Sequence, residues 1–219
     1  DEGITMLPVL TDSFDRIAHL LEQVDGDAPR DIISIGVVGT FALAWLFPRL
    51  TRFEIENPLI ELRLSTNNNR VDIAEEGLDL AIRFGDGAWH ATEAELLFSP
   101  PFTPLCSPET AERLTQPADL LKERLLRSYR VEDWRRWLEQ AGVEVATVRG
   151  PVFDSARLMV EAAIDGFGVA LAPADLFEGQ IAAGTLCRPF PTAVPLGAYF
   201  LTYLKSRSLT PAMERLRNW

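Results

Sequence analysis

The chain has 219 residues, of which 47% are hydrophobic, 24% charged and 9% aromatic, the composition of an ordinary globular protein. This composition excludes a disordered chain, a collagen and a long coiled-coil array. The formal net charge of −11 means that the surface as a whole repels phosphate backbones, so this chain alone is not expected to bind nucleic acid.

The first 28 residues contain the pattern of an amphipathic helix. Apolar residues recur at steps of three and four from Leu7 to Val24, and Pro8 fits only in the first turn. A polar stretch ending at Pro29 predicts a linker. Two interpretations stay open: the helix packs on its own domain, or its apolar stripe binds a partner helix. Because the chain begins at Asp1 rather than at methionine, we expect that an upstream part of the protein precedes it.

From residue 31 onward, β-rich runs alternate with helical patterns. The runs 32–38, 60–64 and 78–84 predict strands. An apolar face from 43 to 53 predicts a helix after the first strand, and a short helix is predicted at 70–76. This βαβαβ succession predicts a parallel sheet with right-handed crossovers.

A polar loop at 85–95 separates this unit from a second unit of the same kind. Thr210 followed by Pro211 is typical of an N-cap and first helical turn. The simplest architecture is therefore two α/β units in series. The further strands are predicted at 103–106, 125–129, 152–153, 169–171 and 199–204, and the further helices at 117–123, 132–141, 156–165, 174–180 and 211–219.

Motifs for catalysis, metals and cofactors are absent from the sequence. The two histidines, His19 and His90, have no metal-ligand spacing, and the two cysteines, Cys106 and Cys187, form no CxxC motif. GxSxG, SxxK, Walker and GxGxxG motifs are also missing. No run approaches the ~20 apolar residues of a membrane span, and no leader opens the chain. We therefore expect a cytoplasmic protein that is not an enzyme and holds no metal or cofactor.

Polar side chains follow three predicted strands where each strand gives way to a helix. Such strand ends meet at the crevice of an α/β sheet, and helix N-termini attract carboxylates and phosphates. Each residue also fits the alternative of a simple helix cap, but together they favour a binding cleft for an anion. The candidates are Gly39 and Thr40 after the first strand, Ser65, Asn67 and Asn68 after the second, and Asp154 and Ser155 in the second unit.

Three further side chains lie near the same predicted edge. The guanidinium of Arg83, near the end of its strand, suits a carboxylate ligand but equally suits pairing with Asp72 or Asp86. Asp72 itself fits a cap in a first helical turn. Tyr199 lies where the chain recrosses to the first unit, where a phenol lines the cleft or sits in the hinge.

At these residues the sequence resembles the effector-binding domain of LysR-type transcriptional regulators. The general marks are EEGLDLAIRFG at 75–85, GFGVALAP at 166–173 and the opening amphipathic helix. A closer resemblance is to the AmpR group of β-lactamase regulators. It is carried by LPVLTDSFDRIA at 7–18, GVVGTFALAWLFPRL at 36–50, LSTNNNRVDIAEEGLD at 64–79, GDGAWH at 85–90, LLRSYRVEDW at 125–134 and VFDS at 152–155.

The resemblance implies an α/β fold with two Rossmann-like subdomains, similar to type II periplasmic binding proteins, after an N-terminal linker helix. It implies a linker or dimerisation helix at 1–28, a first effector subdomain at 29–98 and 204–219, and a second at 99–203. DNA would be bound only by an upstream helix-turn-helix. The implied assembly is a homodimer or homotetramer without membrane contact.

The implied ligand is a muropeptide or UDP-MurNAc-pentapeptide, held in the cleft between the subdomains. The family's ligand positions fall on Thr40, Asp72 and Tyr199, with Gly39 and Phe41 beside them. The AmpR group carries a hydroxyl residue where this chain has Ala156. Ser155 therefore takes over that contact, or the peptide preference differs.

Two other classes share this fold. A type II solute-binding protein for an amino acid or small anion requires a secretion leader and has no use for the opening helix. An enzyme on this fold requires a catalytic cysteine or carboxylate in the crevice, and neither cysteine lies at a predicted helix-opening loop.

Overall fold

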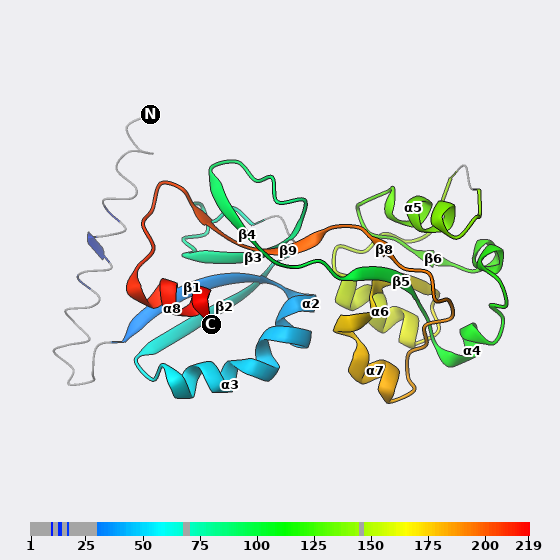
Figure 1. Ribbon diagram of the computed structural model, residues 1–219, viewed down its shortest axis with the longest axis horizontal. Coiled ribbons are helices and arrows are strands. Elements are labelled where there is room, and N and C mark those ends of the chain that lie inside the picture. The colour runs from blue at the N-terminus through cyan, green and yellow to red at the C-terminus, as the bar shows by residue number, and fades with distance from the viewer. Residues whose placement is uncertain (1–9, 11–12, 15–16, 18–29, 68–70, 145–146) are drawn as a thin grey trace.

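A computed structural model of the chain describes Leu10, Ser13, Phe14, Ile17 and residues 30–67, 71–144 and 147–219. These residues form two lobes, each built on one β-sheet, and the molecule is elongated along the line that joins them (Figure 1). Most of the predicted opening helix at 1–28 lies outside the described residues. The four described residues in it, Leu10, Ser13, Phe14 and Ile17, have helical backbone. No helix in the described part of the chain is long and apolar enough to cross a membrane.

The first lobe contains a five-stranded mixed sheet of order β2-β1-β3-β9-β4. Strand β1 runs parallel to β2 and β3, whereas β9 runs antiparallel to β3 and β4. Helical segments follow β1 without a break, and the second of them is π-helical. The elements are β1 (Asp31–Val38), α2 (Gly39–Phe41), η1 (Ala42–Leu46), α3 (Phe47–Glu56), β2 (Ile60–Asn67), β3 (Leu80–Gly85), β4 (Thr92–Phe98), β9 (Ala198–Leu204) and α8 (Pro211–Asn218).

The second lobe contains a four-stranded sheet of order β6-β7-β5-β8. Here β6 and β7 are parallel, and β5 is antiparallel to both β7 and β8. The elements are β5 (Pro101–Leu105), α4 (Pro108–Ala111), the 3₁₀ helix η2 (Pro117–Lys122), β6 (Leu125–Leu126), α5 (Asp133–Gln140), α6 (Ala156–Ile164), β7 (Val169–Pro173), the 3₁₀ helix η3 (Ala174–Leu176), α7 (Glu178–Ala182) and β8 (Val194–Pro195).

Two predictions about the first lobe were wrong. Its sheet is mixed rather than parallel, because β4, which begins at Thr92 inside the predicted loop, and β9 add an antiparallel half. The predicted helix at 70–76 is a turn over its described part. Asp72 Oδ1 accepts from the backbone N–H of Ala74 and Glu75 at 2.9 and 3.1 Å, which closes a turn instead of starting a helix.

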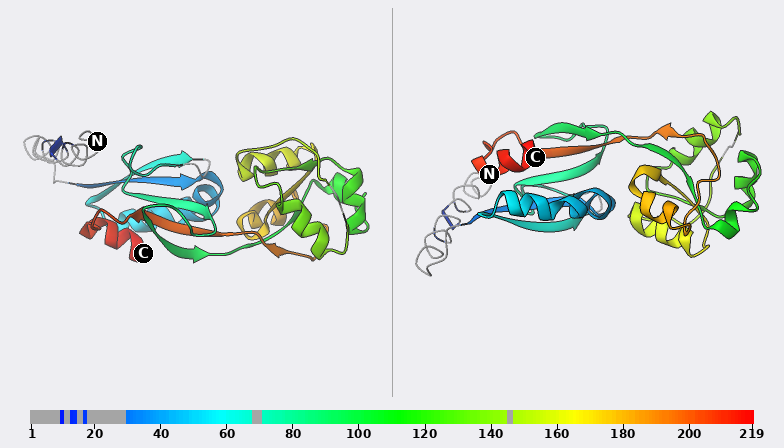
Figure 2. Two further views of the ribbon diagram at one scale, coloured as in Figure 1. Left: turned by 90° about the horizontal axis from the view of Figure 1, so that it is seen from above. Right: turned by 60° about the horizontal axis from the view of Figure 1, so that its bottom comes forward.

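The boundary between the lobes also differs from the prediction. Residues 198–203 were expected in the second subdomain, yet β9 pairs with β3 and β4 of the first sheet. The reason is that β9 supplies hydrogen-bond partners for β3, which would otherwise end the sheet, and joins β4 to it. Two neighbouring segments connect the lobes in every view (Figure 2), and Ser99 Oγ on one donates to the Gly197 carbonyl on the other at 3.1 Å.

The main apolar cluster runs through both lobes, and a smaller one of Val71, Ile73, Leu78 and Ala81 lies in the first lobe. At the junction the rings of Phe84 and Phe102 lie 5.4 Å apart between centroids, so the two sheets share a contact across the connection. In the second lobe, α5 buries Trp134, Trp137 and Leu138, which lie on one face of the helix. The lobes are therefore joined by packing as well as by the chain.

Candidate functional site

The carboxyl end of β1 lies at the boundary between the lobes. Strand β1 ends at Val38, and α2 begins at once with Gly39 and Thr40. Figure 1 shows α2 at the end of the first lobe that faces the second lobe. This segment therefore lies at the junction of the lobes, as the sequence predicted for residues at the carboxyl end of a strand.

A cavity of about 200 Å³ lies at this junction, with walls from both lobes. At roughly 30 Å³ per water molecule, it holds about six or seven waters or an end group of similar size. Its lining residues are Val38, Thr40, Phe84 and Tyr199 from the first lobe, and Phe102, Ser128, Tyr129, Arg130, Phe153, Asp154, Ala156 and Met159 from the second.

Thr40 contributes a buried hydroxyl to this cavity. The residue is 2% exposed, and its Oγ1 atom has no hydrogen-bond partner among the described residues. A buried hydroxyl without a partner is unfavourable, and native proteins keep few of them. Because Thr40 lines the cavity, a molecule that enters it is a source of the missing partner.

Tyr199 and Phe41 form the aromatic wall behind Thr40. The centroids of their rings are 5.3 Å apart, and the Tyr199 ring also lies 4.9 Å from Phe84 and 5.1 Å from Phe98. Tyr199 is only 2% exposed, and burial raises the pKa of its phenol, so this group stays neutral. A neutral phenol in the wall offers both a donor and an acceptor.

Arg130 supplies a positive charge to the cavity, although the sequence argument did not select it. Its guanidinium lies 4.4 Å from the ring centroid of Phe84 in the first lobe and 5.6 Å from that of Phe102 in the second. Its Nε atom donates to Asp133 Oδ2 at 2.8 Å, which fixes the direction of the side chain. Arg130 directly follows the strand predicted at 125–129. The rule that polar side chains at strand ends line the cleft, which selected Thr40, could therefore have selected Arg130 as well.

The second-lobe candidates Asp154 and Ser155 differ in position. Asp154 lines the cavity. Ser155 caps α6 instead, because its side chain accepts from the backbone N–H of Leu158 at 3.4 Å, and it does not line the cavity. Ala156, where the AmpR group has a hydroxyl, does line it.

Of the three candidates after the second predicted strand, only Ser65 has a described side chain, and it does not line the cavity. Ser65 is exposed, Asn67 ends β2, and Asn68 lies outside the described residues. Strand β2 is at the edge of its sheet, with β1 between it and β3. The sequence could place these residues after a strand but could not tell that the strand is peripheral.

Asp72 and Arg83 also lie apart from the cavity lining. Asp72 is exposed and closes the turn described above. The Arg83 guanidinium stacks 4.7 Å from the ring centroid of Trp89, and its Nε atom is buried without a hydrogen-bond partner among the described residues. Burial lowers the pKa of Arg83, and the negative charge of Asp72 opposes this effect. These two residues therefore influence each other inside the first lobe.

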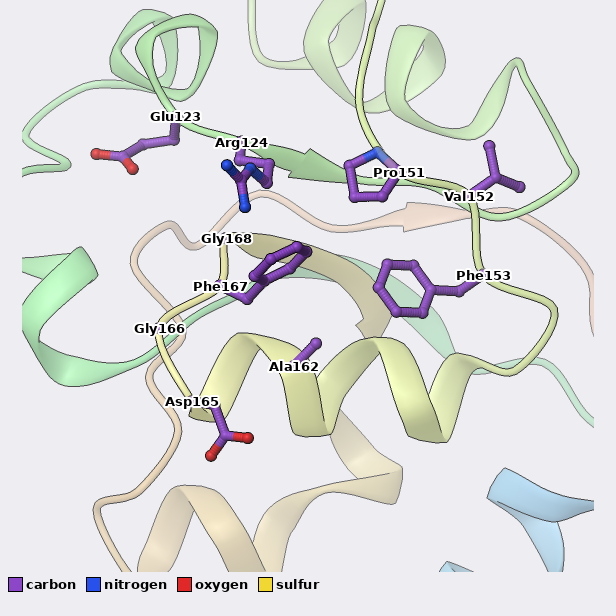
Figure 3. A pocket seen from close by; sticks show the side chains of 10 residues that line it. All are labelled: Glu123, Arg124, Pro151, Val152, Phe153, Ala162, Asp165, Gly166, Phe167 and Gly168. Atoms are coloured by element: carbon purple, nitrogen blue, oxygen red, sulfur yellow. The ribbon is translucent and has the colours of Figure 1, made fainter.

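A larger hollow, of about 910 Å³, lies on the second lobe beside α6 (Figure 3). Arg124 lies there over the ring of Phe167, with its guanidinium 4.4 Å from the centroid. Phe153 points into the hollow from the opposite side and also lines the cavity between the lobes. We take the smaller cavity as the candidate site because it combines walls from both lobes with the buried Thr40 hydroxyl.

Residues 26–219 match the family model described as the LysR substrate binding domain. The chain belongs to this family. Over its whole length it is 55% identical to the HTH-type transcriptional activator AmpR of Pseudomonas aeruginosa and covers 74% of that protein. It is also 48% identical to the HTH-type transcriptional regulator BlaA of Proteus vulgaris and covers 76% of it. The resemblance to AmpR-like LysR regulators is thus confirmed.

Two solved LysR-type effector domains have the same fold. The effector domain of AmpR of Pseudomonas aeruginosa matches with a TM-score of 0.84 at 55% identity, over 86% of this chain and 93% of that chain. The AmpR effector-binding domain of Citrobacter freundii also has a TM-score of 0.84, at 47% identity, over 87% of this chain and 96% of that chain. The predicted two-subdomain fold, similar to type II periplasmic binding proteins, is therefore confirmed.

Within this LysR effector domain, the residues suggested by the resemblance divide into two groups. Thr40 and Tyr199 line one cavity, and Phe41 packs behind them. Asp72 lies apart with Arg83. The candidate site is therefore built around Thr40, Tyr199 and Arg130.

Proposed function

We propose that the cavity between the lobes binds a peptidoglycan-derived muropeptide or UDP-MurNAc-pentapeptide, and that this binding controls β-lactamase expression. The observation that carries the proposal is that Thr40, whose buried hydroxyl has no partner among the described residues, lines this cavity. A relative from Enterobacter cloacae, 44% identical over 94% of this chain, is a transcriptional activator of a carbapenem-hydrolysing β-lactamase. The relatives therefore support the regulation of β-lactamase expression, and the cavity supports the binding of a ligand.

The chemistry of the cavity suits the peptide part of such ligands. Muropeptides carry carboxylates and amides, and a guanidinium such as that of Arg130 binds carboxylates through charge-assisted hydrogen bonds. The hydroxyls of Thr40 and Tyr199 suit amide and carboxylate oxygens. A volume of about 200 Å³ admits an end group of the ligand.

The two-lobed construction provides a way to turn binding into a signal. A ligand changes the balance between two arrangements of the regulator only if it binds one of them more tightly. Arg130 comes from the second lobe and lies over Phe84 of the first, so a ligand held by Arg130 and Thr40 contacts both lobes together. In the proposed mechanism this favours one lobe arrangement and thereby one spacing of DNA-binding heads in a homodimer or homotetramer.

Calorimetric titration with UDP-MurNAc-pentapeptide and with a 1,6-anhydro-MurNAc peptide tests the proposal. Removing a charge-assisted hydrogen bond costs about 1.5–3 kcal/mol, so Arg130→Met is expected to weaken binding by roughly 10- to 100-fold. Arg124→Met is the matched control, because Arg124 also stacks on a phenylalanine ring but in the other hollow. It is expected to bind like the wild type.

Two results would contradict the proposal. The absence of binding heat with either ligand would remove muropeptides as effectors of this domain. Binding that is unchanged by Arg130→Met but weakened by Arg124→Met would move the ligand site from the cavity to the larger hollow beside α6.

A further inference from the structure

The two cysteines of the chain, far apart in the sequence, lie directly opposite each other in the second lobe. The backbone N–H of Cys106 donates to the Cys187 carbonyl at 3.1 Å, and the N–H of Cys187 donates to the Cys106 carbonyl at 2.7 Å. This is an isolated antiparallel bridge just beyond the end of β5. Both thiols are free.

Reciprocal hydrogen bonds of this kind define the spacing of the two residues. In an antiparallel pair that exchanges both bonds, the Cα atoms are about 5.5 Å apart and the side chains point to the same face. Disulfides span Cα separations of about 4.4–6.8 Å. The backbone therefore sets the two Cα atoms at a separation that a disulfide can span, and the Cβ atoms, about 5 Å apart in such a pair, have to approach by about 1 Å for the bond to form.

We propose that Cys106 and Cys187 form an oxidisable pair that closes to a disulfide when the protein meets a hydroperoxide. The fold does not need a disulfide as a scaffold, since one large apolar cluster spans both lobes. The pair is instead a modification site of the folded second lobe. Neither cysteine lines the cavity between the lobes, so this inference does not depend on the proposed ligand.

The surroundings of the two thiols assign them different parts in the reaction. Cys106 is fully buried, and burial raises the pKa of its thiol to about 12, whereas Cys187 is partly exposed. The Cys187 thiol loses its proton and the thiolate attacks the hydroperoxide. The O–O bond breaks, Cys187 becomes a sulfenic acid, and the other oxygen leaves with that proton as an alcohol, or as water when the oxidant is hydrogen peroxide. The Cys106 sulfur then displaces the hydroxyl group, which leaves as water with the Cys106 proton. Two thiols are oxidised and one peroxide is reduced.

The disulfide would join two segments that each lead toward the junction of the lobes. Cys106 follows β5, which begins just after the connection at Ser99, and Cys187 precedes β8, which leads to the connection at Gly197. A bond between these segments restricts the unfolded chain, so the oxidised protein is expected to unfold at a higher temperature than the reduced one.

The test is intact-mass analysis of the whole chain after treatment with hydrogen peroxide, followed by unfolding and alkylation with N-ethylmaleimide. A mass lower by about 2 Da, with no alkylated cysteine and full reversal by dithiothreitol, is expected for the disulfide. Peptide mapping should then find Cys106 joined to Cys187 within one chain.

Cys187→Ala is the control variant, because it removes the more accessible thiol and keeps the buried one. It is expected to stay alkylatable at Cys106 after peroxide treatment. Wild-type protein that still takes up two N-ethylmaleimide groups, or that forms only disulfides between chains on a non-reducing gel, would overturn the proposal. These readouts use the wild type, so the result does not depend on whether the variant folds.

Discussion

Replacing Thr40 with valine tests whether the Thr40 hydroxyl binds a ligand or stabilises the fold. Valine has the shape of threonine but no hydroxyl group. Oγ1 of Thr40 is buried without a partner among the described residues, and such a group costs about 1–3 kcal/mol. The ligand-free Thr40→Val domain is therefore expected to be more stable by about 1 kcal/mol, which is a rise of roughly 2–4 °C in thermal midpoint for a chain of this size.

Thr202→Val is the matched control, because Thr202 is equally buried but its hydroxyl is paired. It is 0% exposed, and its Oγ1 atom donates to the Ala81 carbonyl at 2.9 Å. Removing this bond is expected to lower the free energy of unfolding by about 1 kcal/mol. The two threonine-to-valine changes should thus have opposite signs in urea denaturation without ligand.

Binding should respond in the other direction for Thr40→Val. Losing one hydrogen bond of about 0.5–1.5 kcal/mol weakens binding by up to about tenfold, measured by calorimetric titration with UDP-MurNAc-pentapeptide. If Thr40→Val instead destabilises the ligand-free domain as much as Thr202→Val does, its hydroxyl is paired within the protein. Thr40 would then have no unsatisfied hydroxyl to offer a ligand.

Three further changes test the fold. Trp137→Ala removes a fully buried side chain and should lower the free energy of unfolding by about 3–5 kcal/mol in urea; a loss under 1 kcal/mol would contradict its place in the core. Gly197→Ala places a Cβ atom 2.7 Å from a phenyl ring and should cost about 1–3 kcal/mol, whereas Gly179→Ala meets nothing within 4 Å and should be neutral or stabilising. Lys122 holds the pKa of Asp119 well below its usual range, so the wild type's stability advantage over Asp119→Asn should be present at neutral pH and shrink as the pH falls below about 4. A pH-independent difference in urea denaturation would contradict this last prediction.

Most of the secondary structure could be predicted from local patterns. The alternation and apolar runs at 32–38 and 199–204 correspond to β1 and β9, and Thr210 caps α8 as expected, with its side chain accepting from the Met213 N–H at 3.3 Å. The prediction failed at 70–76, because one aspartate can begin a helix or close a turn by the same hydrogen bonds. Only the surrounding packing decides between these outcomes.

The candidate site could be predicted in part. Thr40, Tyr199 and Asp154 meet at one cavity because their strands or loops end at the junction of the lobes. Arg130 directly follows the strand predicted at 125–129, so the same rule could have selected it, although only Leu125–Leu126 pair in the sheet. A hydroxyl or a charge after a strand is therefore a useful signal, but the position of the strand within its sheet is needed as well.

The sequence by itself determined the period of each element, the residues that cap its ends and the membership of the LysR family, because these depend on the order of neighbouring residues. The tertiary structure alone decided that the first sheet is mixed, that Ser65 lies on a peripheral strand while Arg130 faces Phe84, and that Cys106 lies opposite Cys187. The physical reason is that strand direction and strand order are chosen by hydrogen bonding and packing between distant segments, and these contacts leave no period in the chain.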